Sequence, residues 1–569
     1  MPTLFRRWFD FPLAAVLLHV AALLGVVYAY MRGMETVGGF STEFVHHQHL
    51  ELVLLLYGYA LFHFVQKPSP WRGVLAAVPL LLAYAVHDVF YLVYGKVFRL
   101  INVSEFPELV QILPLAYALA LVATLVLLAA FFLARVDFRR PAKLAAWLLP
   151  LALVSVAVKA APAAFTGAFE SLAAEIVKYS DGKSVEQNGR LAMLAYREAQ
   201  RTLALEGLAP YRDRDGYERE LVALTEPLRD AMQPRNVHLI VLESFLDPRL
   251  FAELRFSSPP VHPAFERLFG NALGLSRSPV FGGATAQAEF EVLCGVPAFE
   301  RFSSVEFNAF SGAPAHCLPG VLARLGYRSV ATNAYKPNFF NAIAGYAGAG
   351  FAESHFPEAY SAARKTYLKL DDPGAEDYAF DRPLFEQNLA FVRQHLAEQP
   401  GRPLFNYMLT IYGHTPHLLD PKLRPERITL VTPYADDHLQ RAVNQFYYRT
   451  EAIAAYVAAL REIDPDGLVI LVSDHVPPLR NGPNTYRALR YLDDREDAYY
   501  YNRIAILDGK AMGAVPELRH YDMPDLVLDR LTGERHCRQH ACGFAAGDRR
   551  LPREAHEARY LRLMAHAAE

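Results

Sequence analysis

Long apolar runs dominate the first 160 residues of the chain, and short polar segments separate them. Five of these runs approach or exceed the roughly 20 residues that a helix needs to cross a bilayer. Such a set is more typical of a multi-pass membrane domain than of buried helices in a soluble core. The expected spans are Pro12–Met31, Leu50–Phe64, Val74–Tyr94, Val110–Ala134 and Leu144–Ala161.

Positive charges between the runs predict which side of the membrane the rest of the chain occupies. Cytoplasmic loops of membrane proteins carry an excess of Lys and Arg. The segment before the first run and the loops after the second and fourth runs are richer in cations than the other two loops. Five crossings of a bacterial inner (plasma) membrane then place everything after Ala161 in the periplasm or at the cell exterior. The richer segments contain Arg6, Arg7, Lys67, Arg72, Arg135, Arg139, Arg140 and Lys143. The other two loops contain only Arg32, Lys96 and Arg99.

His87 and Asp88 are polar residues inside the third apolar run. Ionisable groups at membrane depth are costly and are often functional. Either they mark a path for lipid entry, or they make a hydrogen bond between helices, and the candidate site does not include them.

The pattern changes twice after the last apolar run. Residues 162–235 are rich in Ala, Leu, Glu and Arg, with apolar residues at helical spacing, which indicates a helical linker. From Asn236 onward, short apolar runs of strand length alternate with helical patterns. This alternation is typical of an α/β domain with a central, mostly parallel sheet. The expected organisation is a five-helix transmembrane domain over 1–161, a linker over 162–235 and an extracytoplasmic α/β domain over 236–569.

Continuous apolar runs mark the strands of the α/β domain, as expected for parallel strands buried on both faces. The expected strands are Val237–Leu242, Arg328–Thr332, Leu404–Ile411, Leu468–Val472 and Arg503–Leu507. The expected helices include His316–Leu325, Pro383–Glu398, Val443–Ile463 and Met523–Leu531.

Composition and charge narrow the classes of function. A chain of 569 residues is too long for one compact domain. Its formal net charge of -3 offers no basic surface for phosphate backbones, so no nucleic-acid partner is expected. No Cys-x-x-Cys occurs, which gives no support to a redox motif or a zinc knuckle. In an oxidising compartment the four cysteines could pair as Cys294–Cys317 and Cys537–Cys542, and four free buried thiols are the alternative.

Polar residues follow four of the expected strands. Ligands bind beyond the carboxyl ends of parallel strands, so these residues are expected to converge on one cleft. Among them, two carboxylates and an imidazole suit a divalent cation such as Mn²⁺ or Zn²⁺. Singly, an acid at a strand end is more often a cap or an ion-pair partner. The residues are Glu243, Asn333, Lys336, His414, Asp474 and His475.

The segment Phe281–Glu291 adds a candidate nucleophile, Thr285. Gly282 and Gly283 permit a sharp turn before it. Thr285 is then expected near the N-terminus of a helix, where exposed amides favour an anionic phosphate and an alkoxide. Alternatively, Thr285 is only the N-cap of that helix.

Together these motifs resemble the lipoteichoic acid synthase branch of the sulfatase and alkaline phosphatase superfamily. The resemblance rests on Asn236–Phe245, Gly282–Leu293 and Ser473–His475, on their order, and on the five-span anchor, so it covers nearly the whole chain. The Thr-x-x-x-Glu-Phe-Glu segment followed by Leu-Cys-Gly is its most specific part.

The resemblance implies one divalent metal, Mn²⁺ ahead of Zn²⁺ or Mg²⁺, with Thr285 both a ligand and the nucleophile. The other implied ligands are Glu243, Asp474 and His475. His414 matches a family histidine that contacts the substrate, and Lys336 and Asn333 are further candidates for substrate binding. The implied reaction moves phosphoglycerol from phosphatidylglycerol, a membrane phospholipid, to a glycan or glycolipid hydroxyl through a covalent phosphothreonine.

Two departures leave the head group and the acceptor open. A Trp and an Arg that help to hold phosphoglycerol in the family are missing from Phe339–Ala342, where Lys336 is a candidate replacement for the cation. Val476-Pro477-Pro478 follows the Asp-His pair, where many sulfatases have Gly. A phosphoethanolamine transferase of the same superfamily is the first alternative, a phosphodiesterase is another, and a non-catalytic membrane lipid sensor is the last. No Cys/Ser-x-Pro-x-Arg segment aligns with Thr285, which argues against a formylglycine sulfatase.

Overall fold

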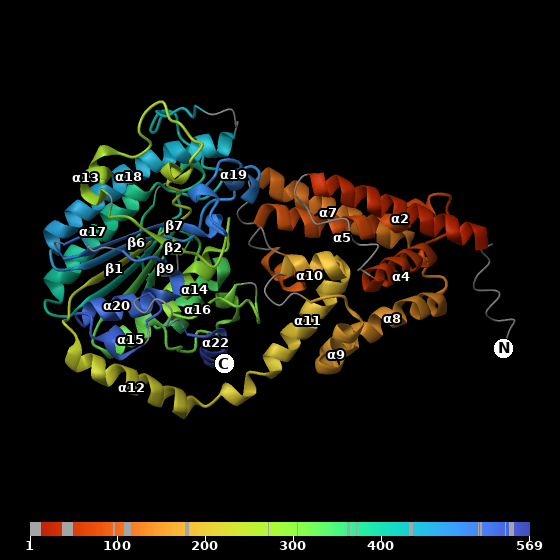
Figure 1. Cartoon of the computed structure of the whole chain (residues 1–569), viewed down its shortest axis with the longest axis horizontal. Helices are drawn as coiled ribbons and strands as arrows, with labels where there is room; N and C mark the ends of the chain where they lie inside the picture. Colours follow the sequence, from red (N-terminus) through yellow and green to blue (C-terminus); the bar gives the residue numbers. More distant parts are fainter. Residues whose placement is uncertain are drawn as a thin grey trace. The chain divides into compact units, whose positions relative to one another are not determined.

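The computed structural model describes residues 13–36, 49–94, 97–106, 115–176, 181–270, 272–303, 305–360, 365–370, 373–431, 436–509, 511–512, 515–540, 542–544 and 551–568. The chain forms two compact units, Met1–Glu206 and Gly207–Glu569 (Figure 1). Helices between residues 162 and 235 are divided between the units. The first unit contains α9 (Pro162–Leu172), α10 (Asp181–Asn188) and α11 (Arg190–Glu206), and the second contains α12 (Arg214–Ala231).

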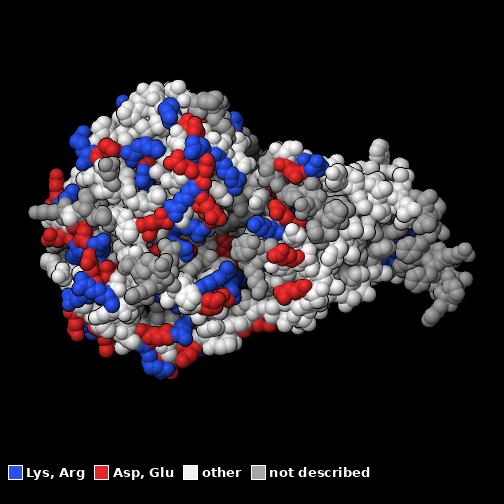
Figure 2. Space-filling view, in the orientation of Figure 1, with Lys and Arg blue, Asp and Glu red and all other residues white. Residues whose placement is uncertain are grey.

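Five apolar helices in the first unit correspond to the predicted spans. Four of them are long and apolar enough to cross a membrane, whereas α4 has 17 residues and is shorter, so the predicted count of five is approximate. Large apolar side chains such as Leu127 (69% exposed) and Leu153 (59% exposed) lie on the surface of this unit. Its visible face carries few charges (Figure 2). Pro12 and residues 110–114 lie outside the described part. The helices are α2 (Leu13–Thr36), α4 (His49–Val65), α5 (Arg72–Tyr94), α7 (Leu115–Arg135) and α8 (Pro141–Ala160).

Buried polar contacts tie α11 to two of these helices. Arg190 donates from Nε to Oδ1 of Asp88 at 2.7 Å and from Nη2 to Oδ2 at 3.0 Å. Glu51 of α4 accepts from the backbone N–H of Ala192 at 2.8 Å, at the start of α11. Carboxylates are favoured at a helix N-terminus because of the exposed amides there. Asp88 is therefore paired with the guanidinium of Arg190, and Glu51 with the N-terminus of α11.

The second unit contains a nine-stranded mixed sheet in the order β4-β3-β5-β1-β6-β7-β2-β9, with β8 paired to β7. Neighbouring strands from β4 to β6 are parallel, and β7 runs antiparallel to β6 and β2. The predicted α/β domain with a mostly parallel sheet is confirmed. The strands are β1 (Val237–Leu242), β2 (Gly274–Arg277), β3 (Arg328–Asn333), β4 (Glu353–His355), β5 (Leu404–Leu409), β6 (Leu468–Ser473), β7 (Tyr501–Asp508), β8 (Ala511–Met512) and β9 (Leu518–Arg519).

Helices cover both faces of the sheet (Figure 1). On one face α13 (Pro263–Phe269), α17 (Asp381–Glu398) and α18 (Asp437–Ile463) enclose an apolar core with the sheet. The other face carries α14 (Thr285–Cys294), α15 (Leu318–Arg324), α16 (Ala342–Ala349) and α20 (Met523–Leu531). The remaining helices of this unit are α19 (Pro483–Ala488), α21 (His536–Gln539) and α22 (Arg553–Ala567).

The four cysteines form two disulfide bonds, with S–S distances of 2.02 Å for Cys294–Cys317 and 2.07 Å for Cys537–Cys542. The first joins the end of α14 to the residue that precedes α15. This is the pairing considered in the sequence analysis, and it replaces the alternative of free thiols.

Candidate active site

Glu243 and Asp474 lie side by side because β1 and β6 end in register, with Leu242 opposite Ser473. Both carboxylates are buried. Ser244, between them, has a φ of 44°, in the left-handed region that few residues other than glycine adopt. Its backbone N–H donates to Oδ1 of Asp474 at 2.7 Å, and its hydroxyl donates to Oε1 of Glu243 at 2.9 Å. A locally strained backbone therefore fixes the two acids relative to each other.

His475 turns one ring nitrogen toward both acids. Its Nε2 lies 3.2 Å from Oδ2 of Asp474 and 4.0 Å from Oε1 of Glu243. Its Nδ1 lies 3.1 Å from the carbonyl oxygen of Val476, which can only accept, so the hydrogen resides on Nδ1. In the neutral ring Nε2 then presents a lone pair to the acids, as in histidines that bind metals.

Thr285 completes the group from the other side. It is the first residue of α14, and its hydroxyl donates to Oε2 of Glu243 at 3.0 Å and lies 3.4 Å from Nε2 of His475. Ala284, with a φ of 58°, is the N-cap, so the reading of Thr285 as the N-cap is wrong. Thr285 is half-buried, whereas the other three residues are buried. The hydroxyl is therefore the most accessible member of the group.

The turn before Thr285 requires Gly282. Its φ is 70°, and a Cβ there would lie 2.8 Å from Cβ of Pro478. The Gly282 N–H also donates to the carbonyl of Val476 at 3.1 Å. The loops that carry the hydroxyl and the imidazole are thus directly joined, and the Val-Pro-Pro departure forms their contact surface.

Charge in this group favours a cation. Burial raises the pKa of Glu243, and the neighbouring Asp474 raises it further. Burial raises the pKa of Asp474 to about 7. Two buried acids are costly to ionise together unless a positive charge compensates them. Oδ2 of Asp474 also lacks a hydrogen bond within the described part of the chain, and the Glu243, Asp474 and His475 ligand atoms lie within 4.8 Å of one another. This donor set fits one divalent metal ion.

Arg449 supports the group from α18. Its buried guanidinium donates to the carbonyl oxygen of Glu243 at 2.6 Å and to Asp381 at 2.7 Å. Gly413 packs directly against the Glu243 carbonyl, because a Cβ at position 413 would lie 1.9 Å from the carbonyl oxygen. Sequence reasoning missed Arg449, although a charged residue aligned with Phe446 and Ile453 on a helix face was a usable signal.

The remaining predicted site residues lie at the ends of β3 and β5. His414 donates from Nδ1 to the carbonyl of Thr415 at 2.8 Å, and its ring lies 4.7 Å from that of Tyr378. Asn333 is buried and donates from Nδ2 to the hydroxyl of Tyr346 at 2.9 Å. Nζ of Lys336 lies 5.3 Å from the centre of the Tyr335 ring. Asn333 therefore supports the protein interior, and Lys336 belongs to an aromatic cluster.

Glu289, within the Thr-x-x-x-Glu-Phe-Glu segment, joins three elements. Its Oε1 accepts from the hydroxyls of Tyr346 in α16 at 2.6 Å and Tyr407 in β5 at 2.7 Å. Burial raises its pKa to about 7. Glu291 is also buried, with its pKa raised by burial to about 8, but it accepts from the backbone N–H of Ala298. The two glutamates of the motif therefore have different partners.

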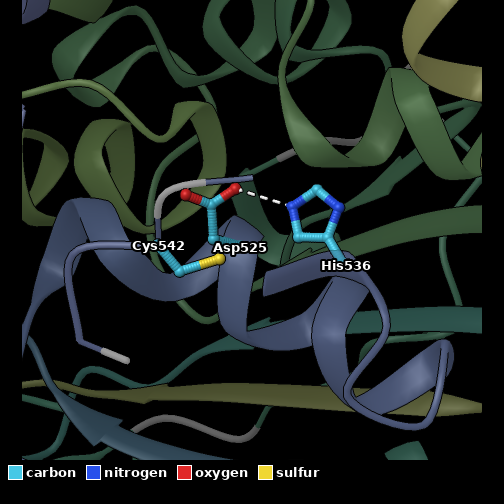
Figure 3. A group of neighbouring side chains, drawn as sticks. All are labelled: Asp525, His536 and Cys542. Carbon is cyan, nitrogen blue, oxygen red and sulfur yellow. Dashed lines mark hydrogen bonds and ion pairs between the residues drawn. The ribbon is translucent and has the colours of Figure 1, made fainter. Parts of the chain in front are cut away.

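A second group of possible metal ligands lies near the C-terminus. Asp525, His536 and Cys542 converge, and Nε2 of His536 is 3.0 Å from Oδ1 of Asp525 (Figure 3). Cys542 is bonded to Cys537, and a metal ligand would have to be the free thiolate. Within the described residues, the group around Glu243 is thus the better metal site.

Comparisons with known proteins support the same superfamily. Residues 235–510 match the Sulfatase family model. A 247-residue stretch is 26% identical to a Rhizobium meliloti (strain 1021) protein provisionally described as a cyclic beta-1,2-glucan modification protein, and covers 43% of this chain and 36% of that protein. The chain thus spans about a third of the length of the curated relatives it matches.

The chain is also similar to solved structures. A Streptococcus pyogenes phosphoglycerol transferase in complex with sn-glycerol-1-phosphate is 18% identical, with a TM-score of 0.48, over 63% of this chain and 91% of that one. A Listeria monocytogenes lipoteichoic acid synthase is 15% identical, with a TM-score of 0.43, over 54% of this chain and 78% of that one. The family-model match and the motifs agree, and residues 235–510 therefore form a sulfatase-family domain.

Proposed function

We propose that the chain is a membrane-anchored, metal-dependent transferase that moves phosphoglycerol from phosphatidylglycerol to a glycan or glycolipid hydroxyl. The observation that carries this proposal is the meeting of the Thr285 hydroxyl with Glu243 and His475 at 3.0 and 3.4 Å. A half-buried hydroxyl beside buried acids is the arrangement expected of an activated nucleophile.

Glu243, Asp474 and His475, with Thr285, would hold one divalent metal, and Mn²⁺ is our first choice, with Zn²⁺ or Mg²⁺ as alternatives. When bound, such an ion lowers the pKa of a coordinated hydroxyl and offsets phosphate charge. The hydroxyl of Thr285 stands at the first turn of α14, where backbone amides favour an anion. Arg449 and Ser244 keep Glu243 in place during both steps.

The reaction has two displacements at phosphorus. First, the Thr285 oxygen gives up its proton and bonds to phosphorus, and the bond from phosphorus to the diacylglycerol oxygen breaks. That oxygen keeps the electron pair and takes up a proton, so diacylglycerol leaves as an alcohol. In the second step the bond from phosphorus to the Thr285 oxygen breaks and that oxygen is reprotonated, while the acceptor hydroxyl bonds to phosphorus and loses its own proton. His414 donates Nδ1–H to a carbonyl, so the Nε2 of the neutral ring is available to take that proton.

The proposed location is the outer face of a bacterial inner membrane. The two disulfides support it, because such bonds persist in oxidising compartments. An anchor keeps the domain at the surface that holds the lipid donor, which raises the effective concentration of that donor. The provisional glucan-modifying description of the Rhizobium meliloti relative supports a glycan acceptor.

Diacylglycerol release from vesicles tests the proposal. The purified full chain with Mn²⁺ is expected to release diacylglycerol from phosphatidylglycerol and not from phosphatidylethanolamine. The Thr285→Ala variant and the metal-chelated protein are expected to be inactive. Release from phosphatidylethanolamine alone would favour the phosphoethanolamine transferase, and release without transfer to any glycan would favour a hydrolase. Metal binding without release from either lipid would favour the lipid sensor.

A further inference from the structure

A chain of aromatic rings leads from His414 toward the surface of the domain. The Tyr378 ring lies 4.7 Å from that of His414 and 6.2 Å from that of Tyr335. Tyr335 in turn lies 5.1 Å from Phe339 and 6.2 Å from Tyr360, measured between ring centres. We call Tyr335, Phe339, Tyr360 and Tyr378 the aromatic patch.

The aromatic patch is continuous with the candidate active site. Gly413, the residue before His414, packs against the carbonyl oxygen of Glu243, because a Cβ at position 413 would lie 1.9 Å from that oxygen, so the His414 loop adjoins the metal-binding group. Exposure then increases with distance from His414. Tyr378 is buried, Tyr335 and Phe339 are half-buried, and Tyr360 is 45% exposed. The patch therefore runs from an exposed ring, Tyr360, to a buried ring, Tyr378, that lies against His414.

The chemistry of the aromatic patch argues against two classes of ligand. Lys336 Nζ lies 5.3 Å from the centre of the Tyr335 ring and 6.0 Å from that of Tyr360. This ammonium group lies over one side of each ring and repels a second cation nearby, which disfavours an ethanolamine head group here. An acyl chain would leave three tyrosine hydroxyls and an ammonium group facing hydrocarbon, which is costly.

A sugar ring satisfies both the aromatic and the polar groups. Its C–H face carries slight positive charge and packs against the negative face of an aromatic ring. Its hydroxyls can accept from Lys336 and exchange hydrogen bonds with tyrosine hydroxyls. Tyrosine supplies such contact area with little loss of side-chain entropy.

We propose that the aromatic patch is the acceptor subsite, which stacks the sugar rings of a glycan and directs one hydroxyl to Nε2 of His414. The proposal rests on the function proposed above and names where its acceptor binds. Phe339 and Tyr360 would hold the outer sugar and Tyr335 the sugar that reacts, while the buried Tyr378 ring supports His414.

Acceptor competition tests this assignment without depending on total activity. The full chain in phosphatidylglycerol vesicles is given a glucose oligosaccharide or glycerol, which has the same reacting hydroxyl and no ring. The ratio of kcat/KM for the oligosaccharide to that for glycerol cancels any loss common to both acceptors. Tyr360→Ala is expected to lower this ratio by about 2- to 12-fold, the value of one aromatic contact.

Two matched variants separate stacking from other effects. Tyr360→Phe keeps the ring and is expected to retain the ratio. Tyr211→Ala, which removes a half-buried tyrosine of the 3-10 helix Ala209–Tyr211, is expected to leave it unchanged. An unchanged ratio in Tyr360→Ala, or a wild type that prefers glycerol, would overturn the subsite. A wild type that cleaves no phosphatidylglycerol would instead refute the proposed function.

Discussion

Glu289 tests how the domain positions Thr285, the proposed nucleophile. It lies four residues after Thr285 and therefore on the same face of α14, one turn further along. Its two tyrosine contacts connect α14 to α16 and to β5, the strand that precedes the His414 loop. We expect Glu289 to be a positioning residue whose loss displaces the Thr285 hydroxyl.

The cost of Glu289→Ala follows from these contacts. The change leaves the hydroxyls of Tyr346 and Tyr407, both fully buried, without their acceptor. Each such orphan costs about 1–3 kcal/mol, so stability falls by roughly 2–6 kcal/mol. A shift of the nucleophile by about 1 Å lowers kcat by about 100-fold. Glu289→Gln keeps an acceptor oxygen for both tyrosines. Its hydrogen bonds are neutral and therefore weaker than those of an ionised carboxylate, so kcat is expected to fall by no more than about 5-fold.

The assay compares kcat and KM for diacylglycerol release with the unfolding free energy of each variant. Glu291→Ala is the matched control, because it removes a buried glutamate of the same helix that accepts from the Ala298 N–H, whereas the Tyr346 and Tyr407 hydroxyls donate to Glu289. Glu289→Ala is expected to lower kcat with KM nearly unchanged, and Glu291→Ala to lower stability alone. Equal losses of kcat in the two variants, or wild-type kcat in Glu289→Ala, would refute the positioning role.

Three further changes have definite expected outcomes. Gly413→Ala forces a methyl group against the Glu243 carbonyl, and should lower bound metal and activity by at least 10-fold in elemental analysis and lipid assays; unchanged metal content would contradict the packing argument. Because the folded state holds the Glu291 proton up to about pH 8 and the unfolded state releases it near 4.5, the contribution of Glu291 to stability falls as pH rises through this window, by at most about 1.4 kcal/mol per pH unit. Glu291→Gln should flatten that slope in chemical unfolding, and an identical slope would show that Glu291 is not responsible. Asp88→Ala removes the carboxylate that accepts two hydrogen bonds from the buried Arg190 and should destabilise the first unit by about 3–5 kcal/mol. Unchanged unfolding in detergent would mean that this ion pair does not stabilise the unit.

Elements with a continuous apolar pattern were predictable from the sequence. Strand β1 and helix α20 have the predicted bounds, and β6 extends one residue further. Buried parallel strands and periodic helical patterns can be recognised in a sequence without knowing which elements they pack against. Helix α18 begins at Asp437, six residues before the predicted start at Val443. Its first turns are polar, and Asp436 caps them by accepting from the backbone N–H groups of His438 and Leu439. The missing apolar residues concealed that start.

Short strands and supporting contacts were not predictable in the same way. Strands β2 and β4 have four and three residues and are specified by pairing with β7 and β3 rather than by their own pattern. Glu243, Asp474 and His475 were found because they follow strands. Arg449 and Glu289 act from helix faces, and their partners are known only once the sheet is assembled.

The central claim is that Thr285 is the nucleophile, and mass spectrometry of the intact chain tests it most directly. The full chain with Mn²⁺ and phosphatidylglycerol, quenched without an acceptor, is expected to gain the mass of one phosphoglycerol group, mapped by peptide analysis to Thr285. Phosphatidylethanolamine and the Thr285→Ser variant serve as controls for the head group and for the hydroxyl. An adduct on another residue, or turnover in a Thr285→Ala variant, would contradict the account.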